Sequence, residues 1–276
     1  MRKILLVCVC LFIPAAVLPA EELTDRVADA ARKIQQSYEK SIISLSAVLK
    51  FEAKGVEGVG ISDQERKAQC LAVIIDPSGL AITALTNLSP QRAMNRIRIR
   101  SQTLEIDSQV EEVKYRLADG TELPARLLLK DEDLDLAFLA PQKPLDEETQ
   151  AKIASVSLSE DVAMPKPLDT VVVLSRGGDD LDYVSMLHLT RISALLDKPR
   201  LFYLCDGGML GAPAFDTEGK LLGIFCRCQK TEGAEENVIR VQRAGGQAIL
   251  PTADILRLLP QAKEEMSKAA ESEKKE

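Results

Sequence analysis

Short stretches of alternating apolar residues, separated by turn residues, recur along most of this chain and constrain its fold more than any other feature. The first is at 43–51, where apolar residues occupy every second position. The turn signals include Pro77-Ser78-Gly79 and Asp119-Gly120. Further strands are expected at 70–76, 80–83, 113–117, 122–129, 135–139, 170–174, 183–196, 201–204, 213–216, 221–228 and 246–250. With few helices between them, these strands predict an all-β sandwich or pair of barrels, not a parallel α/β sheet.

The two ends of the chain carry the helical patterns. Within an N-terminal helix region at 21–40, apolar residues recur every three or four positions over 23–38, which indicates an amphipathic helix. A short closing helix is expected at 254–259. The charged tail at 261–276 is expected to be a solvated, disordered end, with a frayed helix as the alternative. Residues 54–69 are rich in glycine and charge and predict a solvated loop.

Residues 1–20 carry Arg2 and Lys3, then an apolar run, then small residues ending at Ala20. That order is typical of a secretory signal peptide. The alternative is a membrane anchor, but the apolar run is shorter than the ~20 residues that a spanning helix needs. The sequence therefore predicts export to the periplasm or the extracellular space, with no membrane association once the signal peptide is removed.

Charge and histidine content exclude several function classes. Without the signal peptide the chain has 33 basic against 42 acidic residues, a net charge of −9, whereas a general nucleic-acid binder needs a basic surface. His188 is the only histidine, so a histidine-rich metal site is excluded. The sequence contains no glycine-rich phosphate loop or nucleotide motif. No cofactor and no metal are expected.

Three stretches, in order along the chain, resemble the trypsin-like serine proteases, especially their Deg/HtrA branch. They are AVIIDPSGLAITALTNL at 72–88, VKYRLADGTELPARLLLKDEDLDLAFL at 113–139 and DGGMLGAPAFDTEGKLLGIF at 206–225. The residues at 245–259 are similar to that branch's closing strand and helix. The resemblance implies one domain at 41–260, made of two six-stranded antiparallel β-barrels at about 41–140 and 165–250, with the active site between them. Nothing after residue 260 resembles a PDZ module.

The resemblance also implies where a serine endopeptidase triad would lie. The family histidine corresponds to Thr86, the family aspartate to Asp135, and the family serine to Leu210. A threonine hydroxyl cannot serve as general base near neutral pH, and a leucine side chain has no nucleophile. Because the triad works as a unit, losing either group costs nearly as much as losing all three. We therefore expect a pseudoprotease, an exported peptide-binding, protein-binding or regulatory module.

The resemblance implies that the binding cleft of the family can be present even where the catalytic groups are absent. Gly208 and the amide of Leu210 correspond to the oxyanion-hole donors, and the strand at 224–228, with Cys226, Arg227 and Cys228, to the wall along which peptides bind. Two alternatives stay open: a filled cleft without a ligand, and an active endopeptidase with a displaced or non-standard triad. For a displaced triad, His188 and Cys205 are candidates, although a structural histidine is the better interpretation of His188.

Four cysteines follow the signal peptide, Cys70, Cys205, Cys226 and Cys228, and the sequence allows three complete pairings. The resemblance places Cys205 beside the strand of the other two, which suggests a disulfide from Cys205 to Cys226 or Cys228. A cysteine-only metal site is disfavoured because Cys70 belongs to the other barrel.

A longer connection than the family usually has separates Thr86 from Val113. Within it, Arg96, Arg98 and Arg100 alternate with isoleucines, so the three guanidinium groups share one strand face. A charged edge strand that resists aggregation explains this pattern, and an added hairpin that meets an acidic partner is the functional alternative.

Overall fold

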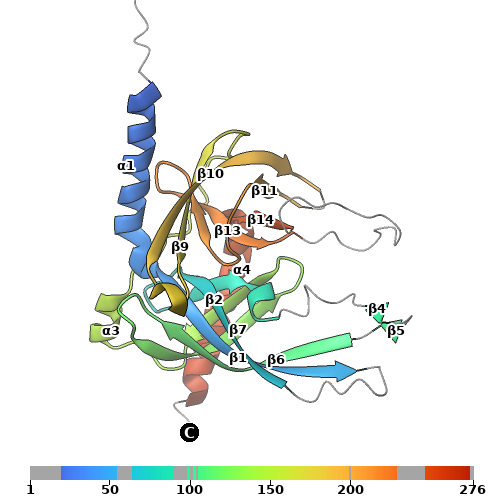
Figure 1. Ribbon diagram of the computed structural model, residues 1–276. Helices are drawn as coiled ribbons and strands as arrows, with labels where there is room; N and C mark the ends of the chain where they lie inside the picture. The colour runs from blue at the N-terminus through green and yellow to red at the C-terminus, as the bar shows by residue number, and fades with distance from the viewer. Residues whose placement is uncertain are drawn as a thin grey trace, which may run out of the picture.

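Two closed β-barrels stand one above the other, with a helix along the outside of the upper barrel and another across the back of both (Figure 1). The computed structural model describes residues 20–54, 64–89, 98–99, 102–103, 105–198, 200–228 and 246–273. The expected fold class, two six-stranded antiparallel barrels with helices near the ends, is confirmed.

The first barrel has the strand order β1-β2-β3-β8-β7-β6. Its strands are β1 (Ile42–Lys54), β2 (Gln64–Ile74), β3 (Ala81–Ala84), β6 (Glu105–Arg116), β7 (Glu122–Asp131) and β8 (Leu136–Pro141). The alternating residues of β1, from Ile43 to Leu49, point into this barrel and are almost completely buried. The apolar residues at every second position of the sequence are thus the residues that face the inside of a closed barrel.

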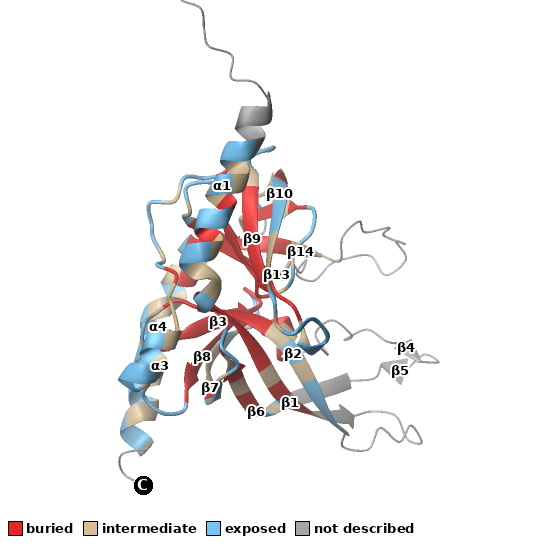
Figure 2. Ribbon diagram, turned by 60° about the vertical axis from the view of Figure 1, so that its left-hand side comes forward, coloured by how far each residue is buried: buried red, intermediate tan, exposed pale blue. Residues whose placement is uncertain are grey.

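The second barrel has the order β10-β11-β14-β13-β12-β9. Its strands are β9 (Thr170–Arg176), β10 (Ser185–Leu196), β11 (Phe202–Cys205), β12 (Pro213–Phe215), β13 (Leu221–Arg227) and β14 (Gln247–Pro251). Successive residues of β9 are buried, so both faces of this strand are covered, one by the barrel interior and one from outside (Figure 2).

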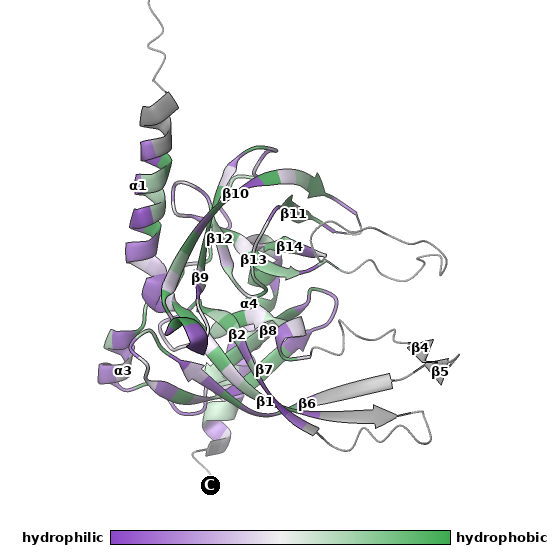
Figure 3. Ribbon diagram, viewed as in Figure 1, coloured by the Kyte–Doolittle hydropathy of each residue, from purple (hydrophilic) through white to green (hydrophobic). Residues whose placement is uncertain are grey.

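The outer cover of the second barrel is α1 (Ala20–Tyr38). Ala31 and Ile34 are buried in the same apolar cluster as β9, and Tyr38 stacks on Phe215 with 5.1 Å between ring centroids. The opposite face of α1 is polar (Figure 3), as the amphipathic pattern predicts. The expected signal peptide lies outside the described residues except for Ala20, where α1 begins. Among the described residues no helix is long and apolar enough to cross a membrane.

The C-terminal tail corrects a prediction, because it is helical. A single helix, α4 (Thr252–Glu273), replaces the short closing helix and most of the tail expected to be disordered. Ala262 is fully buried, and Lys263 forms an ion pair of 2.9 Å with Asp76 of the first barrel. The sequence pattern predicts a solvated end because most residues of α4 beyond Pro260 are polar and exposed. The few residues that pack against the barrels hold the helix in place. Pro260 lies inside α4, where it removes one helical hydrogen bond.

Two further predictions are refined around the first barrel. Strand β2 begins at Gln64, so the expected loop at 54–69 is shorter, and residues 55–63 lie outside the described part of the chain. The connection before β6 contains a two-stranded hairpin of β4 (Arg98–Ile99) and β5 (Gln102–Thr103). Arg96 and Arg100 lie outside the described residues, so the arginine stripe stays a prediction.

A buried arginine joins the two barrels. Arg176, at the end of β9, is 5% exposed. Its guanidinium donates to three backbone carbonyls, those of Glu39 (2.7 Å), Ile42 (3.1 Å) and Tyr183 (2.9 Å). The first two belong to the entry into β1, through the 3-10 turn Glu39–Ser41. Burial lowers the pKa of this guanidinium, and the carbonyls replace the water that it loses.

The connection between the barrels is also held by the backbone. It contains α3 (Glu147–Lys152), whose N-cap Asp146 accepts a hydrogen bond from the amide of Thr149. Farther on, the amide of Val156 donates to the carbonyl of Ile74 at the end of β2. This bond holds the connection against the first barrel before the chain enters β9.

The helical tail gives a stability prediction. Ending the chain at Pro260 removes Ala262, Lys263 and Met266 from the first barrel, and we expect a loss of about 2 kcal/mol in the free energy of unfolding, because apolar burial is lost. Lys268→Ala is the control, since Lys268 pairs with exposed glutamates of α4 and should change stability by less than about 0.5 kcal/mol. Urea unfolding followed by circular dichroism measures both. Equal stability of the shortened and full chains would show that the tail does not dock.

Candidate functional site

A buried carboxylate lies where the two barrels meet. Asp135 precedes β8, is 1% exposed, and accepts hydrogen bonds on both carboxylate oxygens. Oδ1 accepts from the amide (2.7 Å) and the hydroxyl (2.8 Å) of Thr86, and Oδ2 accepts from the amide of Arg227 (2.7 Å). Thr86 belongs to the first barrel and Arg227 to the second. The carboxylate therefore links the two barrels.

The local backbone fixes the position of this carboxylate. Asp135 has φ of 55°, a left-handed conformation that aspartate tolerates better than most residues. Its carbonyl accepts from the amide of Leu85, which opens the 3-10 turn Leu85–Asn87 after β3. The carboxylate of Asp131 accepts from the amide of Leu134 and shapes the preceding turn. Thr86 and Asp135, which are 49 residues apart, are thus brought together as the resemblance implies.

Leu210 lies in the loop between β11 and β12 and contacts the main apolar cluster. Its carbonyl accepts a bond of 3.0 Å from the side-chain amide of Asn87, which also donates to the hydroxyl of Thr83. That hydroxyl donates in turn to the carbonyl of Leu71. Asn87 therefore holds the Leu210 loop to the first barrel. The sequence analysis did not single it out, and its place directly after Thr86 was the available signal.

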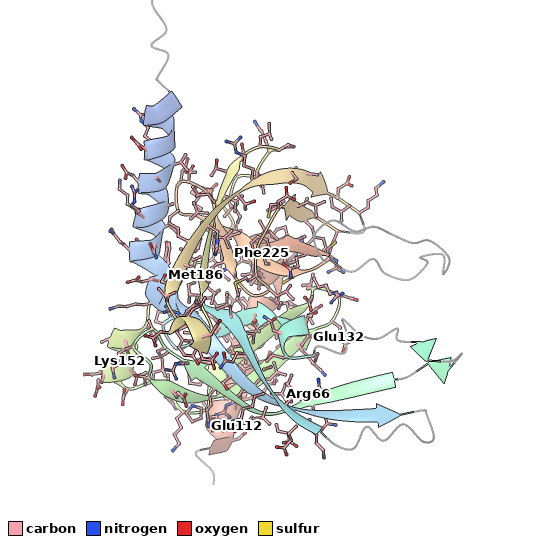
Figure 4. All side chains as sticks on the ribbon, in the orientation of Figure 1. Arg66, Glu112, Glu132, Lys152, Met186 and Phe225 are labelled. Carbon is pink, nitrogen blue, oxygen red and sulfur yellow. The ribbon has the colours of Figure 1, made fainter. Side chains whose placement is uncertain are left out.

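Two glycines let this loop lie close to its neighbours. A Cβ atom on Gly208 would lie 2.2 Å from the ring of Phe225, which is labelled in the second barrel in Figure 4. A Cβ on Gly211, whose φ is 84°, would lie 2.3 Å from the carbonyl oxygen of Leu71. Such distances are shorter than any real carbon contact. The loop conformation therefore requires glycine at both positions.

The wall beside the loop is the end of β13. Phe225 accepts from the amide of Gly211 (2.8 Å) and donates to the carbonyl of Ala212 (2.9 Å). The amide of Cys228 bonds to Gly246 on the β14 side, so Phe225 and Arg227 direct their main chains toward the junction of the barrels.

Several main-chain groups at this junction have no hydrogen-bond partner within the described part of the chain. They include the amides of Gly208 and Leu210 and the carbonyl of Arg227. Main-chain donors and an acceptor are therefore unused by the described residues beside the loop that carries Leu210.

The side chains of Thr86 and Leu210 offer little chemistry. The hydroxyl of Thr86 donates a hydrogen bond to the carboxylate and cannot act as a base. The side chain of Leu210 has no nucleophilic group. The only histidine, His188, is exposed on β10, where its Nε2 lies 3.1 Å from the hydroxyl of Ser175. Its hydrogen bond is to β9 of the same barrel. Within the described ranges no group of histidine, cysteine and acidic side chains could hold a metal ion.

The expected disulfide does not form in the structure, where Cys70, Cys205, Cys226 and Cys228 are free thiols. Strand β14 lies between β11, which carries Cys205, and β13, which carries the other two. Two strand spacings are roughly 10 Å, beyond the roughly 7 Å between Cα atoms that a disulfide can bridge.

The thiols are also poor nucleophiles. Burial, with the nearby Asp206 carboxylate, raises the pKa of Cys205 to about 11, and burial raises the pKa of Cys70 to about 12. Burial, with the charge of Asp135, raises the pKa of Cys226 well above its ordinary value, and burial also raises that of Cys228. The reactive thiolate form is therefore scarce at neutral pH at all four positions.

The three bonds to Asp135 predict the effect of removing its charge. In Asp135→Asn one carboxylate oxygen becomes an NH₂ group that faces a donor, so we expect a loss of about 3 kcal/mol in the free energy of unfolding. Asp216→Asn is the matched control, because Asp216 accepts two amide bonds in a surface turn and should lose about 1 kcal/mol or less. Denaturant unfolding compares the two. Equal losses would mean that the bonds of Asp135 are no more important than those of a surface turn.

Comparisons with known proteins agree with this geometry. A family model described as a trypsin-like peptidase domain matches residues 70–224, more than half of the chain. Among solved structures, the HtrA-type protease AlgW with a tripeptide matches with a TM-score of 0.52 at 15% identity. The match covers 83% of this chain and 62% of that one, so this chain spans less than two thirds of that protein. No curated protein sequence matches. At this identity the structural likeness establishes the fold alone.

Proposed function

The chain belongs to the trypsin-like peptidase family, and we propose that it is an exported, non-catalytic member that binds an extended peptide or protein segment at the junction of its barrels. One observation carries the proposal. The carboxylate that would orient an imidazole in a serine protease instead holds the hydroxyl and amide of Thr86 and the amide of Arg227. Export rests on the signal-peptide pattern of residues 1–20.

The argument against catalysis is that the hydroxyl, the base and the orienting acid must act together. Here the acid is present, but Thr86 occupies the place of the base and Leu210 the place of the hydroxyl. Loss of the nucleophile or base alone costs about 10⁶ in kcat in such enzymes. The rival proposal, an active peptidase with other groups, finds little support among the described thiols, whose pKa values are all raised.

The argument for binding is that the main-chain groups a peptide would use are still free. A bound segment could donate an N–H to the carbonyl of Arg227 and place a carbonyl or carboxylate oxygen at the amides of Gly208 and Leu210. These bonds need no triad, since they come from the backbone. The side chain of Leu210 would meet such a segment with an apolar contact. The acidic net charge argues against nucleic acid as the ligand.

The first experiment tests catalysis. The mature protein, Leu210→Ala, Leu210→Ser and the double variant Thr86→His/Leu210→Ser are each incubated with a fluorescent casein and with a fluorophosphonate probe. We expect background hydrolysis and no labelling for the first three, because each lacks at least one essential group. The double variant restores the family's three residues around Asp135, and we expect it to be labelled by the probe.

Reproducible casein hydrolysis by the unmodified protein, equal in Leu210→Ala and absent from a no-protein control, would refute the non-catalytic proposal. Labelling of Leu210→Ser alone would mean that a base other than residue 86 acts here. Search for that base would begin at His188.

The second experiment tests binding. Fluorescently labelled peptides from a casein digest are titrated with the protein, and fluorescence anisotropy reports binding. Leu210→Trp places a bulky ring beside the free amides, and we expect it to weaken binding at least tenfold. Leu168→Trp is the matched control, because Leu168 is 71% exposed in the connection before β9.

Equal binding by both tryptophan variants would place the peptide elsewhere on the protein. No binding by the unmodified protein would favour a filled junction without a ligand.

A further inference from the structure

We propose that the free edge of β10, over Ser185–Leu189, docks against the same edge of a second copy of this chain, with the two strands antiparallel. This inference does not depend on the proposed function. It rests on how the main chain of β10 is used, on which side chains are exposed there, and on the charges at the two ends of the segment.

Among the described residues, only one edge of this segment is paired. Strand β10 pairs with β9 from Ser185 to Arg191 and with β11 from Ile192 to Leu196. Two flanking bonds define the direction of its main chain: Ile192 donates to the carbonyl of Asp169, and the carbonyl of Val184 accepts from Gly177. Both bonds lie on the β9 side, and the register between them is regular. Even-numbered residues therefore face β9, and odd-numbered residues face away from it.

Three odd-numbered residues have unused main-chain groups. The N–H and C=O groups of Ser185, Leu187 and Leu189 have no hydrogen-bond partner in the described ranges. Gln35 of α1 reaches only the side chain of Ser185. Beyond Leu189, the carbonyl of Asp206 accepts from the hydroxyl of Thr190, so the loop after β11 lies against the upper end of the segment. The free edge is thus bounded and about five residues long.

The segment is partly exposed and carries three large apolar side chains, together with Ser185 and the exposed His188. Leu189 is 51% exposed, and Leu187, on the same face, is half-buried. Met186, labelled in Figure 4, lies on this strand and is also half-buried. An exposed strand edge with large apolar residues is a place where another strand adds. Proteins usually block such edges with lysine or proline, and neither residue occurs between Ser185 and Leu196.

Charge complementarity favours a second copy as the occupant. Asp179, Asp180 and Asp182 are exposed just before the segment, and Arg191 is exposed just after Leu189. None of these four has an ion-pair partner among the described side chains. When two copies pair antiparallel, the acidic end of each segment lies beside the basic end of the other. A parallel pair would place like charges together.

The apolar residues fit the same symmetry. In the register that pairs Leu187 with its own copy, Ser185 lies opposite Leu189 of the second copy. The leucines of both copies then form one continuous apolar strip on a shared sheet face, while the odd-numbered main-chain groups bond across the axis. A segment of an unrelated protein would need to match both the apolar and the charge pattern, whereas the chain matches itself.

Sedimentation velocity tests the proposal on the mature protein up to about 1 mM, where even weak pairing is visible. We expect a dimer. Leu189→Pro removes an N–H on the free edge and leaves the β9 ladder intact, so we expect the dissociation constant to rise at least tenfold. Leu168→Ser is the matched control, because it removes another exposed leucine away from the edge and should change nothing. Circular dichroism confirms that each variant is folded.

A charge exchange tests the antiparallel arrangement. Arg191→Asp and Asp180→Arg should each weaken the dimer about threefold, and the double variant should recover it, because the exchanged charges again face each other across the axis. A monomer at all concentrations would overturn the proposal, as would a dimer that Leu189→Pro leaves unchanged. A dimer that both single charge variants leave unchanged would overturn the antiparallel pairing.

Discussion

The carboxylate of Asp135 is the constraint on which the junction of the barrels depends. A charge buried this deeply must be surrounded by donors, and donors to it come from Thr86 and Arg227 in different barrels. The hydrogen bonds to this carboxylate fix the positions of the turn before β8, the turn after β3 and the end of β13. In an active trypsin-like protease the same position would orient an imidazole. Here the described donors to this carboxylate belong to the protein itself, so the acid holds the two barrels together.

The loop around Leu210 is held in the same way. Gly208 lies against the ring of Phe225, Gly211 lies against Leu71, and Asn87 donates to the carbonyl of Leu210. These contacts hold the main chain through two glycines and one amide bond, in addition to the packing of the Leu210 side chain against the main apolar cluster. The loop therefore retains its shape although its side chain has no nucleophile. This is the physical basis for proposing a binding role without chemistry.

Most strands could be predicted because each barrel strand has one face toward a core, which imposes a period of two. The strand expected at 213–216 is β12, and that expected at 246–250 is β14, each within a residue or two. The predictions fail where contacts between residues far apart in the sequence determine the local structure. The exposed residues of α4 predict a solvated end, but docking of Ala262 and Lys263 stabilises it as a helix. Asn87 was missed because its place after Thr86 does not reveal its bond to Leu210, which is 123 residues away.

The sequence by itself determined an all-β fold, because strand periodicity is local, and through its resemblance to a family it pointed to Thr86, Asp135 and Leu210, because residue identity is read directly. Only the tertiary structure decided what Asp135 bonds to, that Cys205 lies two strands from Cys226, and that one edge of β10 is unpaired. These depend on strand order and register. Residues far apart in the sequence are brought together by barrel closure, which no local signal encodes.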